Sequence, residues 1–198
     1  MLRVGLTGSI ATGKSTVLGM MNAHDIPTIS SDDIVHRLYE GAAVAPVEAL
    51  FPGVTTEGRI DRRALAADLF AAPEQTAALE AIVHPMVRAR IAAFFDEAEA
   101  RGAPLAVAEI PLLFEGAHDY GLDAVVVVTV DDAIQRQRAL ARPGMNVEKL
   151  DAILARQMPQ SEKKRHATYV VDTSASLAAT GDAITAVVGD LLANQQAQ

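Results

Sequence analysis

The stretch Gly8-Ser9-Ile10-Ala11-Thr12-Gly13-Lys14-Ser15 lies between a short apolar run and a segment with helical apolar periodicity. Glycine, four free positions and then Gly-Lys-Ser are typical of a phosphate-binding loop between a strand and a helix. The glycines let backbone N–H groups converge on an anion, and the start of the helix adds the positive end of its dipole. We expect Lys14 to bridge the outer phosphates and the Ser15 hydroxyl to ligate Mg²⁺. A Gly-rich turn that matches by accident is the alternative, which the flanking strand and helix patterns disfavour.

The composition limits the class of protein. The 198 residues suffice for one domain, 1–198, or for a domain with a modest insertion. Half of the residues are hydrophobic but only 4% are aromatic, which predicts a core of Ala, Val, Leu and Ile. A net charge of −8 argues against a protein that coats nucleic acid or an anionic membrane. Local clusters of Lys, Arg and backbone N–H groups must therefore meet any anionic ligand.

The sequence contains no cysteine, which excludes disulfides, thiolate metal sites and thiol nucleophiles and is compatible with a reducing compartment. The sequence shows neither a signal-peptide pattern nor an apolar run near the roughly 18 residues that cross a bilayer. We therefore expect a cytoplasmic protein with no membrane or nucleic-acid partner, acting as a monomer or a weak homo-oligomer.

Apolar runs alternate with helical patterns, which predicts an α/β fold with a doubly wound five-stranded parallel sheet. The fourth run is almost continuous Val and is typical of a central strand buried on both faces. The predicted strands are 2–7, 26–30, 105–110, 124–130 and 169–172. Helices are predicted over 14–24, from 31 or 32 to 38, near 47–51, over 62–70 and 73–101, from 131 or 132 to 143, over 147–157 and over about 177–193. We expect only the Gln-rich tail beyond them to be disordered.

Residues from about 41 to 101 interrupt this alternation, and we expect them to form a helical insertion that receives a second substrate. Pro73 suits a first helical position, whereas Pro85 should kink or divide its helix. The basic and polar side chains of the insertion are more often solvated surface than ligand; they are Arg62, Arg63, His84, Arg88 and Arg90.

Arg138 and Arg142 are one helical turn apart and therefore share a face, and a Pro-Gly break follows them. This is typical of a mobile lid that excludes water and brings guanidinium charge to the transferring phosphoryl group. We expect a lid over about 138–166, in which Arg142 is the better candidate for catalysis. Arg136 is expected on a solvated face, paired with acidic residues such as Asp151.

Asp32 follows Lys14 by eighteen residues and comes just after the second predicted strand. Ligands of open α/β sheets bind beyond the carboxyl ends of the strands, so Asp32 and the phosphate loop are expected at the same edge. A carboxylate there can orient and deprotonate an attacking hydroxyl. The alternative is that Ser31 or Asp32 only caps the next helix. Glu109, at the end of the third strand, is a weaker candidate that holds a magnesium-bound water or simply faces the edge.

A phosphate loop alone leaves open whether the phosphate goes to water or to a substrate. The small GTP-binding switches would need Asp-x-x-Gly after a strand and Asn-Lys-x-Asp near the base, and neither motif occurs. Several further segments carry a more specific pattern. They are Gly8 to Thr16, Ser30-Ser31-Asp32, Arg62-Arg63-Ala64-Leu65, His84-Pro85, Pro111-Leu112-Leu113-Phe114-Glu115, Arg138 and Arg142 with Gln157, and Tyr169-Val170-Val171-Asp172.

Together these segments resemble the dephospho-coenzyme A kinase family, and the likeness extends from Leu2 to about Thr173. His-Pro followed about 25 residues later by Pro-Leu-Leu-x-Glu is its most specific part. The resemblance implies that the sheet is of the P-loop kinase type, with a nucleoside-monophosphate-kinase-like core, and that the protein uses ATP and Mg²⁺. It implies that ATP phosphorylates the ribose 3′-hydroxyl of dephospho-coenzyme A to give coenzyme A and ADP, the last step of coenzyme A biosynthesis.

The same resemblance implies roles for individual residues. Asp32 corresponds to the base, Lys14 to the phosphate-binding lysine and Arg142 to the lid arginine at the phosphoryl group. The residues implied for the ATP phosphates are Gly8, Ala11, Thr12, Gly13, Lys14, Ser15 and Thr16. Those implied for the acceptor are Asp32, His84, Pro111, Leu112 and Leu113.

The sequence departs from the family pattern at two positions. Ser30 stands where the family usually has Asp. If that carboxylate helps to hold magnesium through water, the Ser30 hydroxyl or Asp33 must take its place here. Thr173 stands where the family more often has Asn, which concerns adenine recognition. Two other functions fit the residues: a kinase for another small acceptor such as a nucleoside, gluconate or shikimate, and a nucleotide-gated binding module that hydrolyses ATP slowly.

Overall fold

The computed structural model describes residues 1–196, and the contacts within the chain divide it into two compact units. The sheet unit consists of Met1–Ser30 and the chain from Phe95 onward. The inserted unit is Ser31–Phe94. The inserted unit leaves the sheet unit after its second strand, and its bounds are earlier at both ends than the insertion predicted over about 41–101.

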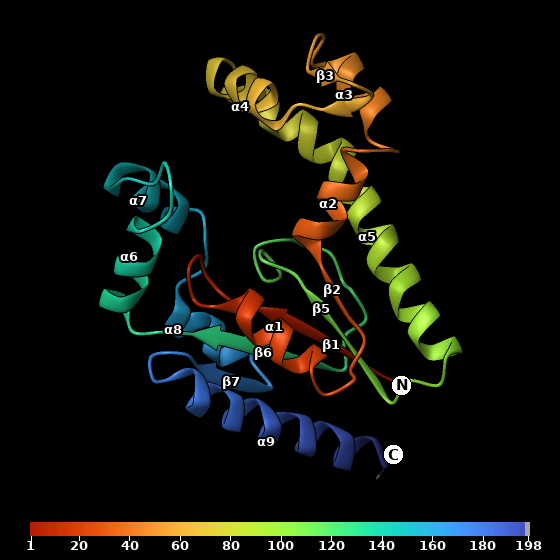
Figure 1. Ribbon diagram of the computed structural model, residues 1–198, viewed down its shortest axis with the longest axis vertical. Coiled ribbons are helices and arrows are strands. Elements are labelled where there is room, and N and C mark those ends of the chain that lie inside the picture. Colours follow the sequence, from red (N-terminus) through yellow and green to blue (C-terminus); the bar gives the residue numbers. More distant parts are fainter. Residues whose placement is uncertain (197–198) are drawn as a thin grey trace. The chain divides into compact units, whose positions relative to one another are not determined.

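Five parallel strands form the sheet, as predicted, in the order β2-β5-β1-β6-β7 (Figure 1). Their bounds are β1 Leu2–Thr7, β2 Thr28–Ser30, β5 Leu105–Glu109, β6 Ala124–Thr129 and β7 Tyr169–Asp172. The central strand β1 places Leu2 opposite Leu105 of β5 and Val4 opposite Ala124 of β6. The residues of β6 are buried or nearly so, which confirms its prediction as a strand covered on both faces.

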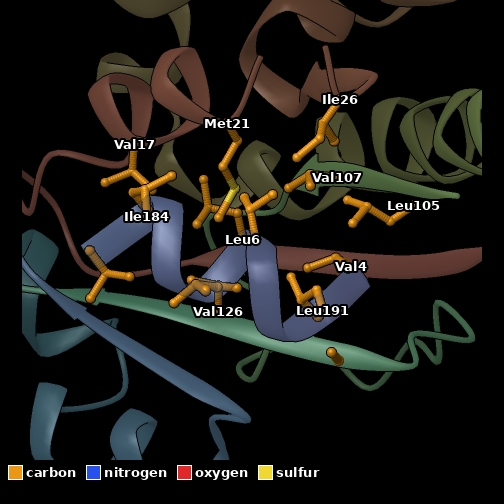
Figure 2. Packing of buried hydrophobic residues seen from close by; sticks show 14 of the residues in the cluster. Val4, Leu6, Val17, Met21, Ile26, Leu105, Val107, Val126, Ile184 and Leu191 are labelled. Atoms are coloured by element: carbon orange, nitrogen blue, oxygen red, sulfur yellow. The ribbon is translucent and has the colours of Figure 1, made fainter. Parts of the chain in front are cut away.

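One face of the sheet carries the main hydrophobic core. Alternate residues of β1, such as Val4 and Leu6, point to this face, because side chains alternate along a strand. They pack against α1 (Lys14–Asn22) and α9 (Leu177–Gln196), as Figure 2 shows. The buried cluster is aliphatic apart from Met21, in agreement with the low aromatic content.

The intervening residues of β1 face the other side of the sheet. Arg3 donates a hydrogen bond to Asp96 at 3.1 Å, and its guanidinium carbon lies 5.7 Å from the centre of the Phe95 ring. Both partners belong to the end of α5 (Thr76–Ala100). Helices therefore cover both faces, which is the doubly wound arrangement.

The segment between β6 and β7 is helical and well capped. The Asp131 carboxylate accepts hydrogen bonds from Ala133 N and Ile134 N at 2.8 and 3.3 Å, so Asp131 is the cap. The helices are α6 Asp132–Leu140, α7 Val147–Ala155, α8 Gln160–Lys163 and the 3₁₀ turn Lys164–His166. Helix α6 ends at Leu140, before the end predicted at residue 143, and Ala141 is its C-cap.

The inserted unit is mostly helical. Its elements are α2 Ser31–Leu38, α3 Val44–Leu50, β3 Thr55–Thr56, β4 Arg59–Ile60, α4 Arg62–Ala71, the 3₁₀ turn Pro73–Gln75 and the start of α5. The small hairpin β3-β4 was not predicted. Its turn residues Glu57 and Gly58 both have positive φ, of 51° and 77°, as tight hairpin turns require.

Pro85 was predicted to kink or divide its helix. It does not divide α5, in which Val83, Val87 and Ile91 form a buried stripe across the proline. Packing of this stripe offsets the backbone hydrogen bond that proline cannot donate. The tail predicted to be disordered is helical up to Gln196, and residues 197 and 198 lie outside the described part. Over residues 1–196, the structure contains no helix with the length and apolar character that crossing a membrane requires.

Candidate active site

The phosphate loop connects the central strand β1 to α1, at the carboxyl edge of the sheet. Gly8 allows this path because a Cβ there would lie 2.4 Å from the carbonyl oxygen of Val128. Gly13, immediately before α1, has a φ of 91°, which is unfavourable for residues with side chains. The strand, loop and helix that the motif requires are therefore present.

The loop closes on its own backbone. The Ser9 carbonyl accepts hydrogen bonds from the Thr12 hydroxyl at 2.9 Å and from Lys14 Nζ at 3.2 Å. Thr12 is fully buried, whereas Ser15 and Thr16 are exposed on the first turn of α1. The lysine thus contacts the loop that is expected to bind phosphate, and the hydroxyl predicted for the metal is accessible.

The donor set fits a magnesium ion that arrives with a nucleotide. Within residues 1–196 no three His, Asp or Glu side chains are grouped as a metal cage would require. Magnesium bound with phosphates usually takes one or two protein oxygens and completes its shell with phosphate and water. The exposed Ser15 hydroxyl is such an oxygen.

Ser30 and Glu109 are neighbours at the carboxyl edge of the sheet. They are paired residues of β2 and β5, and both side chains are buried, with exposed fractions of 9% and 3%. The position where the family usually has Asp therefore adjoins a carboxylate on the next strand.

Thr173, which follows β7, supports the phosphate loop from the opposite end of the chain. Its hydroxyl donates a hydrogen bond to the carbonyl of Thr12 at 2.8 Å. Arg138 donates to the same hydroxyl at 3.0 Å and to the Thr173 carbonyl at 2.8 Å. The residue that replaces the family's usual Asn is thus part of the loop's support.

Three of the predicted phosphate-loop residues, Ala11, Gly13 and Thr16, line one cavity of about 350 Å³ together with both predicted lid arginines. Its lining is Ala11, Gly13, Thr16, Arg138, Arg142, Thr173, Ala175, Leu177 and Thr180. Arg138 and Arg142 share this cavity although α6 ends between them. A volume of this order suits part of a small ligand.

A larger cavity, of about 1070 Å³, lies between α6, α8 and the end of β7. Several of its charged side chains are paired within the protein. Arg136 donates to Asp151 at 2.8 Å, which confirms the predicted surface pair. Hydrogen bonds from Ser174 and the charge of Lys164 hold the pKa of Asp172 below its ordinary value. The phosphate loop thus borders both cavities, with Ser9 lining the larger one and Ala11, Gly13 and Thr16 lining the smaller one.

Pro111, Leu112 and Leu113 follow β5 in the sheet unit. The Leu112 side chain is 46% exposed, whereas Leu113 is 8% exposed and packs beside Gly5. The motif ends at Glu115, whose carboxylate accepts hydrogen bonds from Lys163 Nζ at 2.7 Å and from Met158 N at 2.8 Å. The Lys163 side chain is fully buried, so this ion pair fixes the turn after β5 to α8.

The inserted unit carries Asp32 and His84. Asp32 is exposed on the first turn of α2, two residues after the end of β2, and His84 is exposed on α5. Within this unit, the Arg62 guanidinium carbon lies 5.8 Å from the centre of the Tyr39 ring. Burial raises the pKa of Tyr39, and the charge of Arg62 partly opposes this shift.

Sequence reasoning missed a group of glutamines around the loop. Gln157 was noted only as part of the family pattern, and Gln135 was not noted at all. Gln135 is 4% exposed on α6, where its Nε2 donates to the carbonyl of Ile10 at 2.7 Å. A polar residue on the buried side of an amphipathic helix was the available signal, because buried polar groups need partners.

Comparisons with known proteins agree with this geometry. The family model described as dephospho-CoA kinase matches residues 2–179. A protein of Rhizobium meliloti named dephospho-CoA kinase is 52% identical over 193 residues, which cover 98% of this chain and 100% of that protein. A crystal structure from Thermus thermophilus has a TM-score of 0.78 and 36% identity, covering 96% of this chain and 97% of the other. A dephospho-CoA kinase from Campylobacter jejuni has a TM-score of 0.70 and 25% identity, covering 96% of each chain. The chain described here belongs to the dephospho-CoA kinase family.

Proposed function

We propose that this protein transfers the γ-phosphoryl group of ATP to the ribose 3′-hydroxyl of dephospho-coenzyme A, giving coenzyme A and ADP. The observation that supports this most strongly is the family match over residues 2–179. The cavity that joins the phosphate loop to Arg138 and Arg142 supports the nucleotide half of the reaction.

The phosphate loop binds the triphosphate. Its backbone N–H groups and the start of α1 meet the phosphates, with Gly8, Ala11, Thr12, Gly13 and Thr16 as loop members. Lys14 leaves the Ser9 carbonyl, 3.2 Å away, and bridges the outer phosphates. Ser15 would hold the magnesium ion, which would neutralise charge on the phosphates.

Asp32 is the proposed base for the 3′-hydroxyl. Its exposed carboxylate takes the proton as the hydroxyl oxygen attacks the γ-phosphorus, the bond to the bridging oxygen breaks and ADP leaves. Arg142 supplies positive charge to the transferring phosphoryl group, and its place in the cavity with the loop supports this role.

His84, Pro111, Leu112 and Leu113 are the proposed acceptor contacts. Of the two leucines, Leu112 is the one that a ligand can reach, because it is 46% exposed whereas Leu113 is 8% exposed.

We also propose that the protein is cytoplasmic and is a monomer or weak homo-oligomer. It binds neither nucleic acid nor membrane, in keeping with its charge of −8.

Steady-state assays of Asp32→Asn test the proposal, with Asp68→Asn, an exposed carboxylate on α4, as the control. ADP release is followed with Mg-ATP and dephospho-coenzyme A, adenosine, gluconate or shikimate. We expect turnover only with dephospho-coenzyme A, a loss of about 10²–10⁴-fold in Asp32→Asn with unchanged ATP affinity, and normal turnover in the control. Preference for another acceptor would replace the proposed substrate. Near-normal turnover of Asp32→Asn would exclude Asp32 as the base.

A further inference from the structure

Ile10, the third residue of the phosphate loop, is held on both sides of its backbone. Its N–H donates a hydrogen bond to Gln157 Oε1 at 2.9 Å, and its carbonyl accepts one from Gln135 Nε2 at 2.7 Å. Its side chain packs in a small apolar cluster with Ala11 of the loop and with residues of α6, α7 and the turn between them. Those residues are Ala139, Met145, Leu150 and Leu154.

The two glutamines are themselves fixed. Gln160 Nε2 donates to Gln135 Oε1 at 3.2 Å and to the Val130 carbonyl at 3.1 Å. Gln157 lies just after α7, and the next residue, Met158, donates its N–H to Glu115 at 2.8 Å. The hydrogen bond from Ile10 N therefore ends on an acceptor whose own backbone is anchored to the sheet unit.

The loop needs such outside support. Ala11 has a φ of 60°, in the left-handed region that costs a residue with a side chain about 1–2 kcal/mol. The Ile10 N–H is directed to Gln157, while the N–H groups that follow in the sequence are those proposed for phosphate. Holding the Ile10 peptide sets the direction in which the next peptides point, because consecutive peptide planes share a Cα atom.

We propose that Gln157 is a positioning residue, which fixes the Ile10 peptide and so makes the nucleotide affinity of the phosphate loop depend on the segment after α7. The inference deepens the proposed function and rests on it only in taking a nucleotide phosphate as the ligand of the loop. It gives a reason for the glutamine that follows the arginine pair in the family pattern. Without the Gln157 Oε1 acceptor, the loop becomes ordered only when the nucleotide binds. The conformational entropy lost at that step lowers the affinity for the nucleotide.

Gln157→Met tests the inference, because methionine has a similar length and no carbonyl acceptor. Gln137→Met is the control: that glutamine is exposed on α6, and no contact of its side chain is involved in the network. Three measurements are made on the full chain: the Kd of Mg-ADP by calorimetry, hydrogen exchange at the Ile10 amide by NMR, and Tm. Gln157→Glu, which keeps an oxygen acceptor, is compared by amide exchange alone, since its added charge opposes phosphate binding.

For Gln157→Met we expect a Kd raised about threefold to tenfold, the range that one neutral hydrogen bond supports, and faster exchange at Ile10. Gln157→Glu should keep the slow exchange, and Gln137→Met should match the parent protein in all three measurements. An unchanged Kd with only a lower Tm in Gln157→Met would overturn the inference in favour of a purely structural role. Neither ADP binding nor amide exchange requires the substrate that accepts the phosphoryl group. The outcome of this test is therefore independent of which substrate the enzyme phosphorylates.

Discussion

Arg138 donates two hydrogen bonds to Thr173, from Nη1 to the hydroxyl at 3.0 Å and from Nη2 to the carbonyl at 2.8 Å. The Thr173 hydroxyl in turn donates to the Thr12 carbonyl at 2.8 Å. One buried hydroxyl thus joins α6, the end of β7 and the phosphate loop.

Thr173→Val removes this hydroxyl while keeping the shape of the side chain. Thr12 and Arg138 each lose a partner, so we expect the free energy of unfolding to fall by about 1–3 kcal/mol. Urea denaturation measures it. Thr173→Ser keeps the hydroxyl and should lose much less stability. Equal stability of the two variants would mean that the hydroxyl contributes nothing to the support of the loop.

Gly13→Ala separates backbone strain from damage to the ligand site. Gly13 and Gly53 both have a φ of 91°, and an added Cβ lies 3.4 Å from the Thr173 hydroxyl at Gly13 but near no atom at Gly53. Alanine at either position should cost about 1–2 kcal/mol of stability. Only Gly13→Ala should also weaken Mg-ADP binding in a calorimetric titration. Comparable binding by both variants would contradict a phosphate role for the loop.

Arg142→Ala tests the proposed lid arginine against a nearby arginine with a known partner. Arg142 lines the cavity with the loop, whereas Arg136 is paired with Asp151. We expect Arg142→Ala to lower kcat by about 10²–10³-fold with little change in ATP affinity, because the charge acts on the transition state. Arg136→Ala should keep its kcat. An unchanged rate in Arg142→Ala would remove Arg142 from the mechanism.

Asp172 should contribute a pH-dependent part of the stability. Its pKa is lowered by hydrogen bonds from Ser174 and by Lys164, so folding favours the charged form. The contribution is therefore complete above the unfolded pKa of about 4 and is lost as the pH falls through the lower, folded pKa. In urea titrations, Asp172→Asn should be less stable than the parent at pH 7, and the difference should shrink below pH 4. Asp182→Asn, exposed on α9, is the control. A difference independent of pH would contradict the assignment.

The strands could be predicted from the sequence because each is an apolar run bounded by polar or turn residues. Ala124–Thr129 was predicted one residue too long, and Leu2–Thr7 and Tyr169–Asp172 were predicted with their observed bounds. The hairpin at 55–60 could not be predicted in this way, since its strands have two residues each and its turn depends on backbone angles. The prediction that Pro85 could divide its helix failed because packing of a buried stripe outweighs the local helix preference of one residue.

The phosphate loop and the arginine pair were recognisable because each is a local motif, and three residues of the loop line one cavity with both arginines. The support of the loop was not recognisable. Thr12 and Thr173, or Ile10 and Gln157, are far apart in the sequence, and their hydrogen bonds follow from the order of the strands and from helix docking. The roles of Asp32 and His84 remain predictions that the variants described above can test.

The order of the strands also determines when the sheet can form during synthesis. Leu2 of the central strand pairs with Leu105, so β1 leaves the ribosome roughly a hundred residues before its first partner, and such distant pairing slows folding. The phosphate loop is made well before its support, since Gln157 follows Ile10 by 147 residues and Thr173 follows Thr12 by 161. A nascent chain that stops before Thr173 therefore carries the whole motif without the hydroxyl that holds it, and nucleotide can stabilise the fold fully only after the last strand has emerged.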